Sequence, residues 1–163
     1  MMAHTNTLLP HDMPLRDKLA QLIFVRIGSN LPPIRIVEED EARIAELLKT
    51  CPIGGLVLFN GGPGTPQTLE RLQKVSRYPF LVGSDMERGA GQQIRGLTLF
   101  PHLMAFEKLG TNAHAIVGQF AESIASEARA AGVHIAFAPV TDVNTNRRNP
   151  IIATRAFSES ATS

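Results

Sequence analysis

The chain has 163 residues, of which 44% are hydrophobic and 19% are charged, a composition typical of one globular domain rather than a disordered chain. Its 16 basic and 15 acidic residues are mixed along the sequence and leave a formal net charge of +1. Because no basic block stands out, we expect neither nucleic acid nor a membrane surface as a partner.

Helical and strand patterns alternate along the chain. A proline at position 14 opens the first helix, and acidic residues occupy the first turn of the second, where the helix dipole favours them. The predicted elements are, in order, a helix after Pro14, a strand over 22–28, a helix over 38–50, a strand over 56–59, a helix over 65–76, a strand over 80–83, an irregular stretch over 85–110, a helix over 112–131 and a strand over 133–139.

Three of these helices carry specific signals. In the helix over 38–50, the apolar residues Ile44, Leu47 and Leu48 share one face. Thr65 is predicted to cap the third helix, with Pro66 in its first turn. The last helix has a stripe of apolar residues at helical spacing, and Gly132 ends it. The stripe consists of Ala113, Ile116, Val117, Phe120, Ile124 and Ala128.

Strands that are near-continuous apolar runs and alternate with helices predict βαβ units and a parallel sheet. Two architectures fit this order: a small doubly wound domain, or the N-terminal half of a (β/α)8 TIM-like barrel. A dinucleotide-binding domain requires G-x-G-x-x-G between a strand and a helix, and no such loop is present. A nucleotide-binding domain is therefore the interpretation with the least support.

Polar residues follow three of the predicted strands. They lie in Asn-Gly-Gly-Pro at 60–63, Asp-Met-Glu-Arg-Gly at 85–89 and Pro-Val-Thr-Asp-Val-Asn at 139–144. Ligands of parallel α/β folds bind at the carboxyl ends of strands, although such residues are also common in ordinary loops. Asp85 is either a helix cap or partner of Arg88, or an acceptor for sugar hydroxyls; Arg155 is either a salt-bridge residue or a ligand clamp.

Metal and thiol chemistry have little support. The five histidines, at positions 4, 11, 102, 114 and 134, form no pair with ligand spacing, so we expect no metal or other cofactor. The only cysteine, Cys51, has no base nearby in the sequence and excludes an internal disulfide. The N-terminus shows no signal-peptide pattern, so a cytoplasmic location is expected.

Four segments of the chain together resemble the N-terminal part of the catalytic barrel of glycoside hydrolase family 3, which contains β-N-acetylglucosaminidases and β-glucosidases. The segments are KLAQLIFVRIG, IGGLVLFNGG, FLVGSDMERGAGQQIRGLTLFP and IASEARAAGVHIAFAPVTDVNTNRRNPIIATRAFS. They occur in the family's order between residue 15 and about residue 158. The resemblance favours the half-barrel architecture, with residues 1–163 as a partial catalytic domain that stops after the fourth strand.

The resemblance implies roles for particular residues. Asp85 matches the family's aspartate at the end of the third strand, which binds hydroxyls of the terminal, non-reducing sugar. Arg155 matches the arginine of R-[SA]-F-[GS], which also reaches that sugar. The commonest form of the first motif is D-Q-E-G-G-R-V-Q-R, and this chain has Gln93 in place of its final arginine. Arg95, two residues later, is a candidate replacement.

The family's Lys-His pair and its nucleophilic aspartate occur later than Ser163, so no catalytic residue is assigned in this chain and we expect it to be inactive alone. Asp142 and Glu87 receive no catalytic role from the resemblance. The function implied is that of an exo-acting retaining β-glycosidase whose substrate is a carbohydrate with a β-linked terminal sugar, N-acetylglucosamine being favoured. The alternatives are a β-glucosidase, and an inactive sugar-binding or structural remnant. The sequence does not indicate an oligomeric state.

Overall fold

The computed structural model describes residues 12–161, apart from the side chains of residues 111 and 112. Residues 1–11, which include two of the five histidines and the start of the segment without a signal-peptide pattern, lie outside the described part, as do residues 162–163. Among residues 12–161, none of the helices combines the length and the apolar character needed to cross a bilayer.

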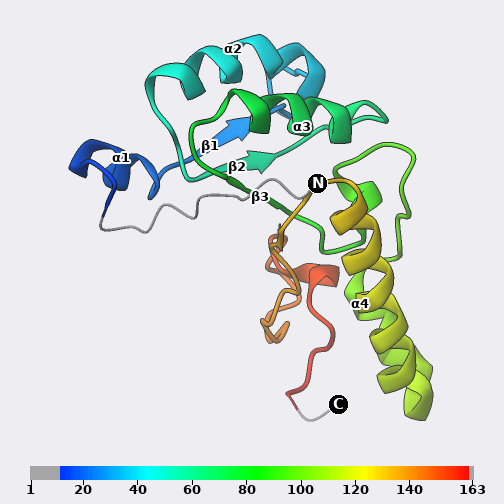
Figure 1. The fold of residues 1–163 in the computed structure, drawn as a ribbon. Coiled ribbons are helices and arrows are strands. Elements are labelled where there is room, and N and C mark those ends of the chain that lie inside the picture. The colour runs from blue at the N-terminus through cyan, green and yellow to red at the C-terminus, as the bar shows by residue number, and fades with distance from the viewer. Residues whose placement is uncertain (1–11, 162–163) are drawn as a thin grey trace.

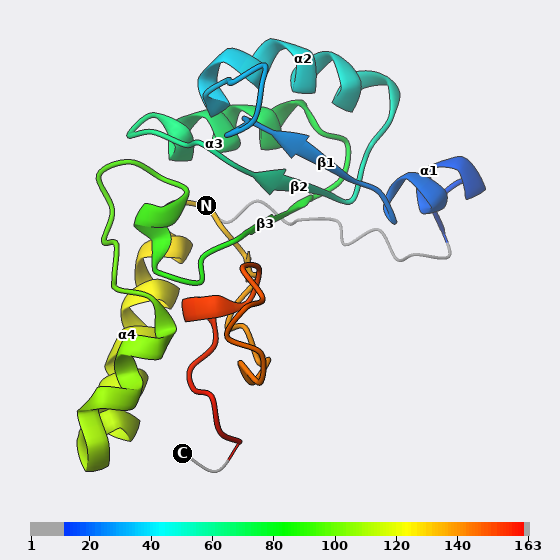
Figure 2. The same cartoon turned by 180° about the vertical axis from the view of Figure 1, so that it is seen from behind.

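The centre of the fold is a parallel sheet of four strands in the order β1-β2-β3-β4. The strands are β1 (Phe24–Ile27), β2 (Gly55–Leu58), β3 (Leu81–Ser84) and β4 (Ile135–Ala136). Helices α2 (Val37–Thr50) and α3 (Thr65–Val75) lie together on one face of this sheet, as Figures 1 and 2 show from opposite sides. This arrangement confirms the predicted α/β class with strands alternating with helices.

The covered face of the sheet is the core. Leu56, Leu58 and Val82 are almost fully buried there, against Ile44 and Leu48 of α2. Ile44 and Leu48 are four residues apart, so both side chains lie on the face of α2 that packs onto the sheet. The helix period read from the sequence therefore correctly identified the buried side of α2.

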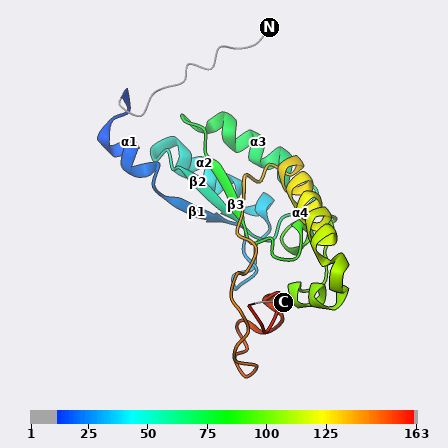
Figure 3. The same ribbon diagram turned by 90° about the horizontal axis from the view of Figure 1, so that it is seen from below.

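The opposite face of the sheet carries no helix, as Figure 3 shows from below. Large apolar side chains there stay partly in solvent: Phe24 is 38% exposed, Leu81 47% and Phe137 43%. The two rings lie over glycines of the neighbouring strands, because a Cβ atom at Gly55 would come within 2.1 Å of the Phe24 ring, and one at Gly83 within 2.6 Å of the Phe137 ring. We refer to this surface, made of Phe24, Leu81 and Phe137, as the open face.

The start of α3 corrects one prediction. Thr65 does not cap the helix: Gly64 is the N-cap residue, and Thr65 is the first helical residue. The Thr65 hydroxyl oxygen instead accepts a hydrogen bond from the Gly62 N–H at 2.9 Å, and its own N–H donates to the Gly62 carbonyl at 3.0 Å. The threonine side chain thus stabilises the glycine turn after β2, which leaves the cap position to the residue before it.

The remaining elements agree in part with the sequence. Helix α1 (Leu15–Ala20) begins after Pro14, as predicted. Helix α4 (Ala113–Ala130) buries three residues of its predicted apolar stripe, Phe120, Ile124 and Ala128, whereas Ile116 of the same stripe is 36% exposed. The stretch predicted as irregular contains two 3-10 segments, and the predicted strand over 133–139 is regular for two residues only. The 3-10 segments of the chain are η2 (Ala90–Gln92), η3 (Leu103–Asn112) and η4 (Ala153–Arg155).

Candidate functional site

The position of Asp85 follows from the alternation of side chains along β3. Val82 and Ser84 are buried on the helix-covered side, and the Ser84 hydroxyl donates to the Leu58 carbonyl at 2.8 Å. Because successive side chains of a strand point to opposite sides, Gly83 and the next odd residue, Asp85, belong to the open face. Asp85 is half-buried at the carboxyl end of β3. A carboxylate therefore stands at the rim where parallel α/β folds bind ligands.

The strongest polar contact of this rim joins Glu87 to Arg155, a residue 68 positions later. The Arg155 guanidinium donates through Nε to Glu87 Oε2 at 2.9 Å and through Nη2 to Glu87 Oε1 at 2.5 Å. This two-point geometry holds the guanidinium in one orientation, which a single bond cannot do. The Glu87 side chain is 13% exposed and that of Arg155 40%, so the cation keeps an edge open to solvent.

The pKa values of Glu87 and Arg155 show which charges at the rim act on each other. The hydrogen bonds from Arg155 hold the pKa of Glu87 below its usual value. The pKa of Arg155 is raised, first by the hydrogen bonds to Glu87 and then by the negative charges of Glu87, Asp85 and Asp142. The structure therefore joins Arg155 to Glu87 by hydrogen bonds, and the negative charge of Asp85 acts on Arg155 through space.

Glu87 was not predicted as the partner of Arg155, because no local pattern links residues so far apart in sequence. Arg88, which the sequence offered as an alternative partner of Asp85, makes a different contact. Its Nε donates to the Phe100 carbonyl at 3.1 Å. Gly89, in the loop after β3, has a φ of 100° and a ψ of 167°, which are accessible almost only to glycine. The glycine of this motif is thus required by the backbone.

The segment after β4 lies against the same rim. Asn144 is 7% exposed, its N–H donates to the Ser158 carbonyl at 3.0 Å, and its side-chain Oδ1 is buried without a hydrogen-bond partner among residues 12–161. Phe157 packs near Phe106 with 6.0 Å between the ring centroids. These contacts hold the turn that contains Arg155 next to the end of β3.

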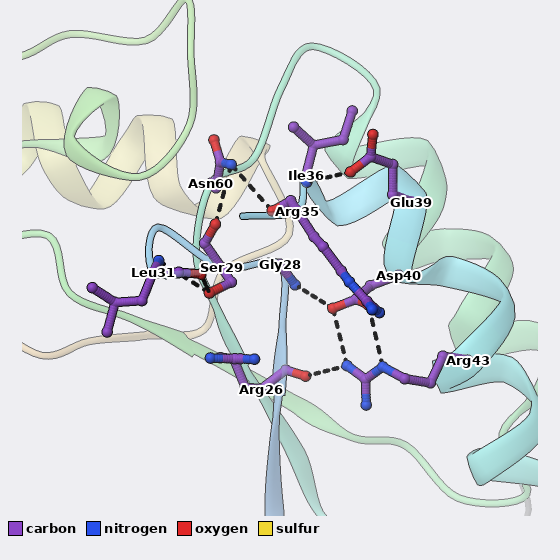
Figure 4. A network of polar contacts seen from close by, with 10 residues as sticks. All are labelled: Arg26, Gly28, Ser29, Leu31, Arg35, Ile36, Glu39, Asp40, Arg43 and Asn60. Carbon is purple, nitrogen blue, oxygen red and sulfur yellow. Dashed lines mark hydrogen bonds and ion pairs between the residues drawn. The ribbon is translucent and has the colours of Figure 1, made fainter. Parts of the chain in front are cut away.

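The loops after β1 and β2 are tied together by a separate network, shown in Figure 4. Asn60, with a φ of 52°, donates through Nδ2 to the carbonyls of Ser29 at 3.3 Å and Arg35 at 3.1 Å. The buried Asp40 carboxylate accepts from the Gly28 N–H at 3.0 Å and from Arg35 and Arg43. Asn60, the polar residue after β2, therefore holds the loops after β1 and β2 together.

Arg95 has different neighbours from Asp85 and Arg155. Its Nη2 lies 3.3 Å from the position of a Cβ atom added to Gly62, and its side chain is exposed. It lines an open pocket of about 330 Å³ together with residues of the α3 and α4 side, including Pro66, Glu127 and Ala130. The structure thus supplies no contact between Arg95 and the Glu87–Arg155 pair.

No group of three or more His, Cys, Asp or Glu side chains in the described part of the chain is arranged to hold a metal ion. Cys51 is a free, half-buried cysteine at the end of α2. The chemistry available at the rim is therefore hydrogen bonding by one oriented guanidinium and by carboxylates, which suits a neutral ligand rich in hydroxyl groups.

Comparison with known proteins gives the family. Residues 14–163 match the profile of the N-terminal domain of glycosyl hydrolase family 3. A β-N-acetylglucosaminidase/β-glucosidase of Cellulomonas fimi is 33% identical over 123 residues, which cover 75% of this chain and 22% of that protein. A β-hexosaminidase of Methylobacillus flagellatus is 32% identical over 131 residues, covering 75% of this chain and 36% of the relative. The chain thus spans about a fifth to a third of the length of these relatives.

Solved structures agree in fold. LpqI of M. tuberculosis superposes with a TM-score of 0.69 at 23% identity, over 94% of this chain and 42% of that one. NagZ from Neisseria gonorrhoeae, in complex with N-trifluoroacetyl-D-glucosamine, gives a TM-score of 0.62 at 23% identity, over 86% of this chain and 42% of that one. The four strands and their helices are accordingly the N-terminal half of a (β/α)8-type barrel, and through residues 14–163 the chain belongs to glycosyl hydrolase family 3.

Proposed function

We propose that this chain forms the sugar-binding part of an exo-acting retaining β-glycosidase, which hydrolyses an O-glycosidic bond and releases a terminal, non-reducing sugar. The observation that carries the proposal is the Arg155 guanidinium, which Glu87 holds in one orientation and which also feels the charge of the Asp85 carboxylate at the end of β3. A carboxylate accepts from ring hydroxyls and a guanidinium donates to them, so the pair can hold two hydroxyls of one sugar.

An N-acetylhexosamine is the favoured sugar. The names of the Cellulomonas fimi and Methylobacillus flagellatus relatives and the sugar derivative in the gonococcal structure support it. The first of these names also includes β-glucosidase activity, so a β-glucoside is the second candidate substrate. A cytoplasmic location remains part of the proposal, and the free Cys51 is compatible with a reducing compartment.

Glu87 is unsuited to the acid/base step. A glycosidase acid must carry a proton near neutral pH and therefore needs a raised pKa. The pKa of Glu87 is instead lowered by its hydrogen bonds to Arg155. We accordingly propose positioning and substrate binding, and no proton transfer or nucleophilic attack, for the rim carboxylates Asp85 and Glu87.

The test is hydrolysis of two chromogenic substrates, a β-N-acetylglucosaminide and a β-glucoside. Both are assayed with the protein made from its complete coding sequence and with the 163-residue chain. Hydrolysis by the first protein and loss of activity in its Asp85→Asn variant would support the proposal, and the preferred substrate would identify the sugar. Turnover by the 163-residue chain that Asp142→Asn abolishes would instead place catalytic groups within these residues and refute the assignment.

A further inference from the structure

A second pocket lies on the other side of the rim, at the carboxyl ends of β1 and β2. It has a volume of about 180 Å³ and is separate from the residues around Glu87 and Arg155. Its lining consists of Arg26, Ser29, Asn30, Leu31, Phe59 and Gln93. Asp85, Glu87 and Arg155 are not among the residues that line this pocket.

The strand register places Arg26 on the same face of the sheet as Asp85. Arg26 is paired with Val57, and Val57 is paired with Gly83, so the three residues form one row across β1, β2 and β3. Asp85 follows Gly83 by two positions and therefore points to the same side. Two strand spacings separate β1 from β3, about 10 Å, a gap that a sugar ring and a long arginine side chain can fill together.

Arg26 is an exposed residue whose guanidinium has no partner within the part of the chain that the structure describes. Its carbonyl oxygen accepts a hydrogen bond from Arg43 Nη2 at 2.8 Å, but its guanidinium makes no hydrogen bond or ion pair with any residue between 12 and 161. Figure 4 shows the guanidinium pointing away from Asp40 and Arg43, the groups that surround its backbone. None of the carboxylates of residues 12–161 occupies the donor groups of Arg26, so within this half of the barrel they can donate to a ligand.

The other polar group of the pocket is also a donor. Gln93 is 7% exposed, and its Oε1 accepts from Asn30 Nδ2 at 2.9 Å, which fixes the orientation of the amide. Its Nε2 has no hydrogen-bond partner within the described residues. The Ser29 hydroxyl is occupied, because it donates to the Leu31 carbonyl at 2.7 Å. Arg26 and Gln93 therefore offer N–H groups to oxygen acceptors of a ligand in this pocket, beside the carboxamide of Asn30.

We propose that Arg26 is a further substrate-binding residue, which donates to a hydroxyl oxygen of the same terminal sugar that Asp85 binds. Resting on the proposed function, this inference adds a cation on the β1 side of the sugar, opposite Arg155. Position 93, where the commonest family motif has arginine and this chain has Gln93, lines the same pocket. The geometry thus points to Arg26, rather than Arg95, as the cation that serves this side of the site.

The experiment compares Arg26→Met with the wild type, both made from the complete coding sequence, on whichever chromogenic glycoside the wild type hydrolyses. Loss of a charged hydrogen bond made equally to the bound sugar and to the transition state is expected to raise KM about 10-fold with kcat nearly unchanged. Arg26→Lys should recover part of the affinity, since it keeps the charge and loses the planar fork. Arg129→Met, which removes an exposed arginine from α4, is the matched control and should leave KM unchanged.

The possible outcomes separate the inference from the function on which it rests. Because the Arg26 guanidinium has no hydrogen-bond or ion-pair partner among residues 12–161, Arg26→Met should leave the melting temperature of the 163-residue chain unchanged. An unchanged KM in Arg26→Met, or a fall in kcat accompanied by a fall in melting temperature, would overturn the assignment of Arg26. Failure of the wild type to hydrolyse either glycoside would refute the proposed function itself.

Discussion

Two glutamate–arginine pairs of the same geometry occur in this chain, in different surroundings. Glu87 accepts two bonds from Arg155 at the rim, and Glu41 accepts two from Arg71, both at 2.7 Å, between α2 and α3. In both pairs hydrogen bonding lowers the pKa of the carboxylate. The further negative charges that act on Arg71 are those of Glu70 and Glu38, on the helices, whereas those that act on Arg155 are Asp85 and Asp142, in the loops after β3 and β4. The proposed role of Glu87 and Arg155 in sugar binding therefore follows from their position at the rim and not from the geometry of the pair.

We expect Glu87→Gln to weaken sugar binding about 10-fold. A carboxamide keeps one acceptor but loses the charge, so it no longer fixes the orientation of the Arg155 guanidinium. The measurement is the KM of the protein made from its complete coding sequence, or the Kd of the sugar by calorimetry. Glu41→Gln is the matched control and should bind sugar like the wild type. Equal effects of the two variants would show that the rim pair only stabilises the fold.

The connection from β1 to α2 depends on one buried carboxylate. Asp40 lies in the first turn of α2, and its side chain is 3% exposed. It accepts hydrogen bonds from the Gly28 N–H and from Arg35 and Arg43, so it joins the end of β1, the following loop and the helix (Figure 4). The loop that forms the Arg26 pocket is held in place by this network.

Asp40→Asn is expected to lower the free energy of unfolding by about 2 kcal/mol near neutral pH, because the amide loses the charge-assisted bonds to both arginines. The bonds from Arg43 are the largest cause that lowers the pKa of Asp40 below 3.8, and burial opposes them. A lowered folded-state pKa gives stability that is present above the ordinary value and is lost as the pH falls through the folded-state pKa.

The difference between wild type and Asp40→Asn should accordingly be complete at about pH 7 and smaller at about pH 3, because this stability is lost as the pH falls below the ordinary aspartate pKa toward the lowered folded-state pKa. Urea unfolding followed by circular dichroism at the two pH values measures it. Glu46→Gln is the control, since its exposed pair with Lys49 should contribute little at either pH. A difference that is the same at both pH values would contradict an origin in the Asp40 charge.

The molecule as a whole has an apolar surface that its own helices do not cover. The open face exposes Phe24, Leu81 and Phe137, and β1 and β4 are the edge strands of the sheet. Exposed edges and contiguous apolar patches favour association with another chain.

We therefore expect the 163-residue chain, purified alone, to self-associate through the open face. Leu81→Lys should reduce this association, because it places a charge at the centre of the apolar surface. Leu15→Lys, on α1 at the side of the molecule, is the control and should not change it (Figure 1). Sedimentation velocity at several concentrations measures the effect, and a wild-type chain that stays monomeric would contradict the prediction.

The order of elements was predictable because each depends on neighbours in sequence. The apolar run at 80–83 and the period of α2 indicated the strand and the buried helix face directly, and the structure confirms both. Thr65 was misassigned because its hydroxyl bonds the Gly62 N–H in the preceding turn rather than its own helix. Local patterns do not show which of two nearby N–H groups a hydroxyl will contact.

The sequence by itself determined the α/β class, the likeness to glycoside hydrolase family 3, and Asp85 and Arg155 as candidate ligands, since these depend on apolar periodicity and on contiguous motifs. Only the tertiary structure decided that Glu87 holds Arg155, that Arg95 has other neighbours, and that Arg26 lines a pocket after β1 and β2 with no partner for its guanidinium among residues 12–161. The physical reason is that strand pairing and long-range ion pairs join residues tens of positions apart. Their partners are chosen by the register of the sheet, which no short stretch of sequence records.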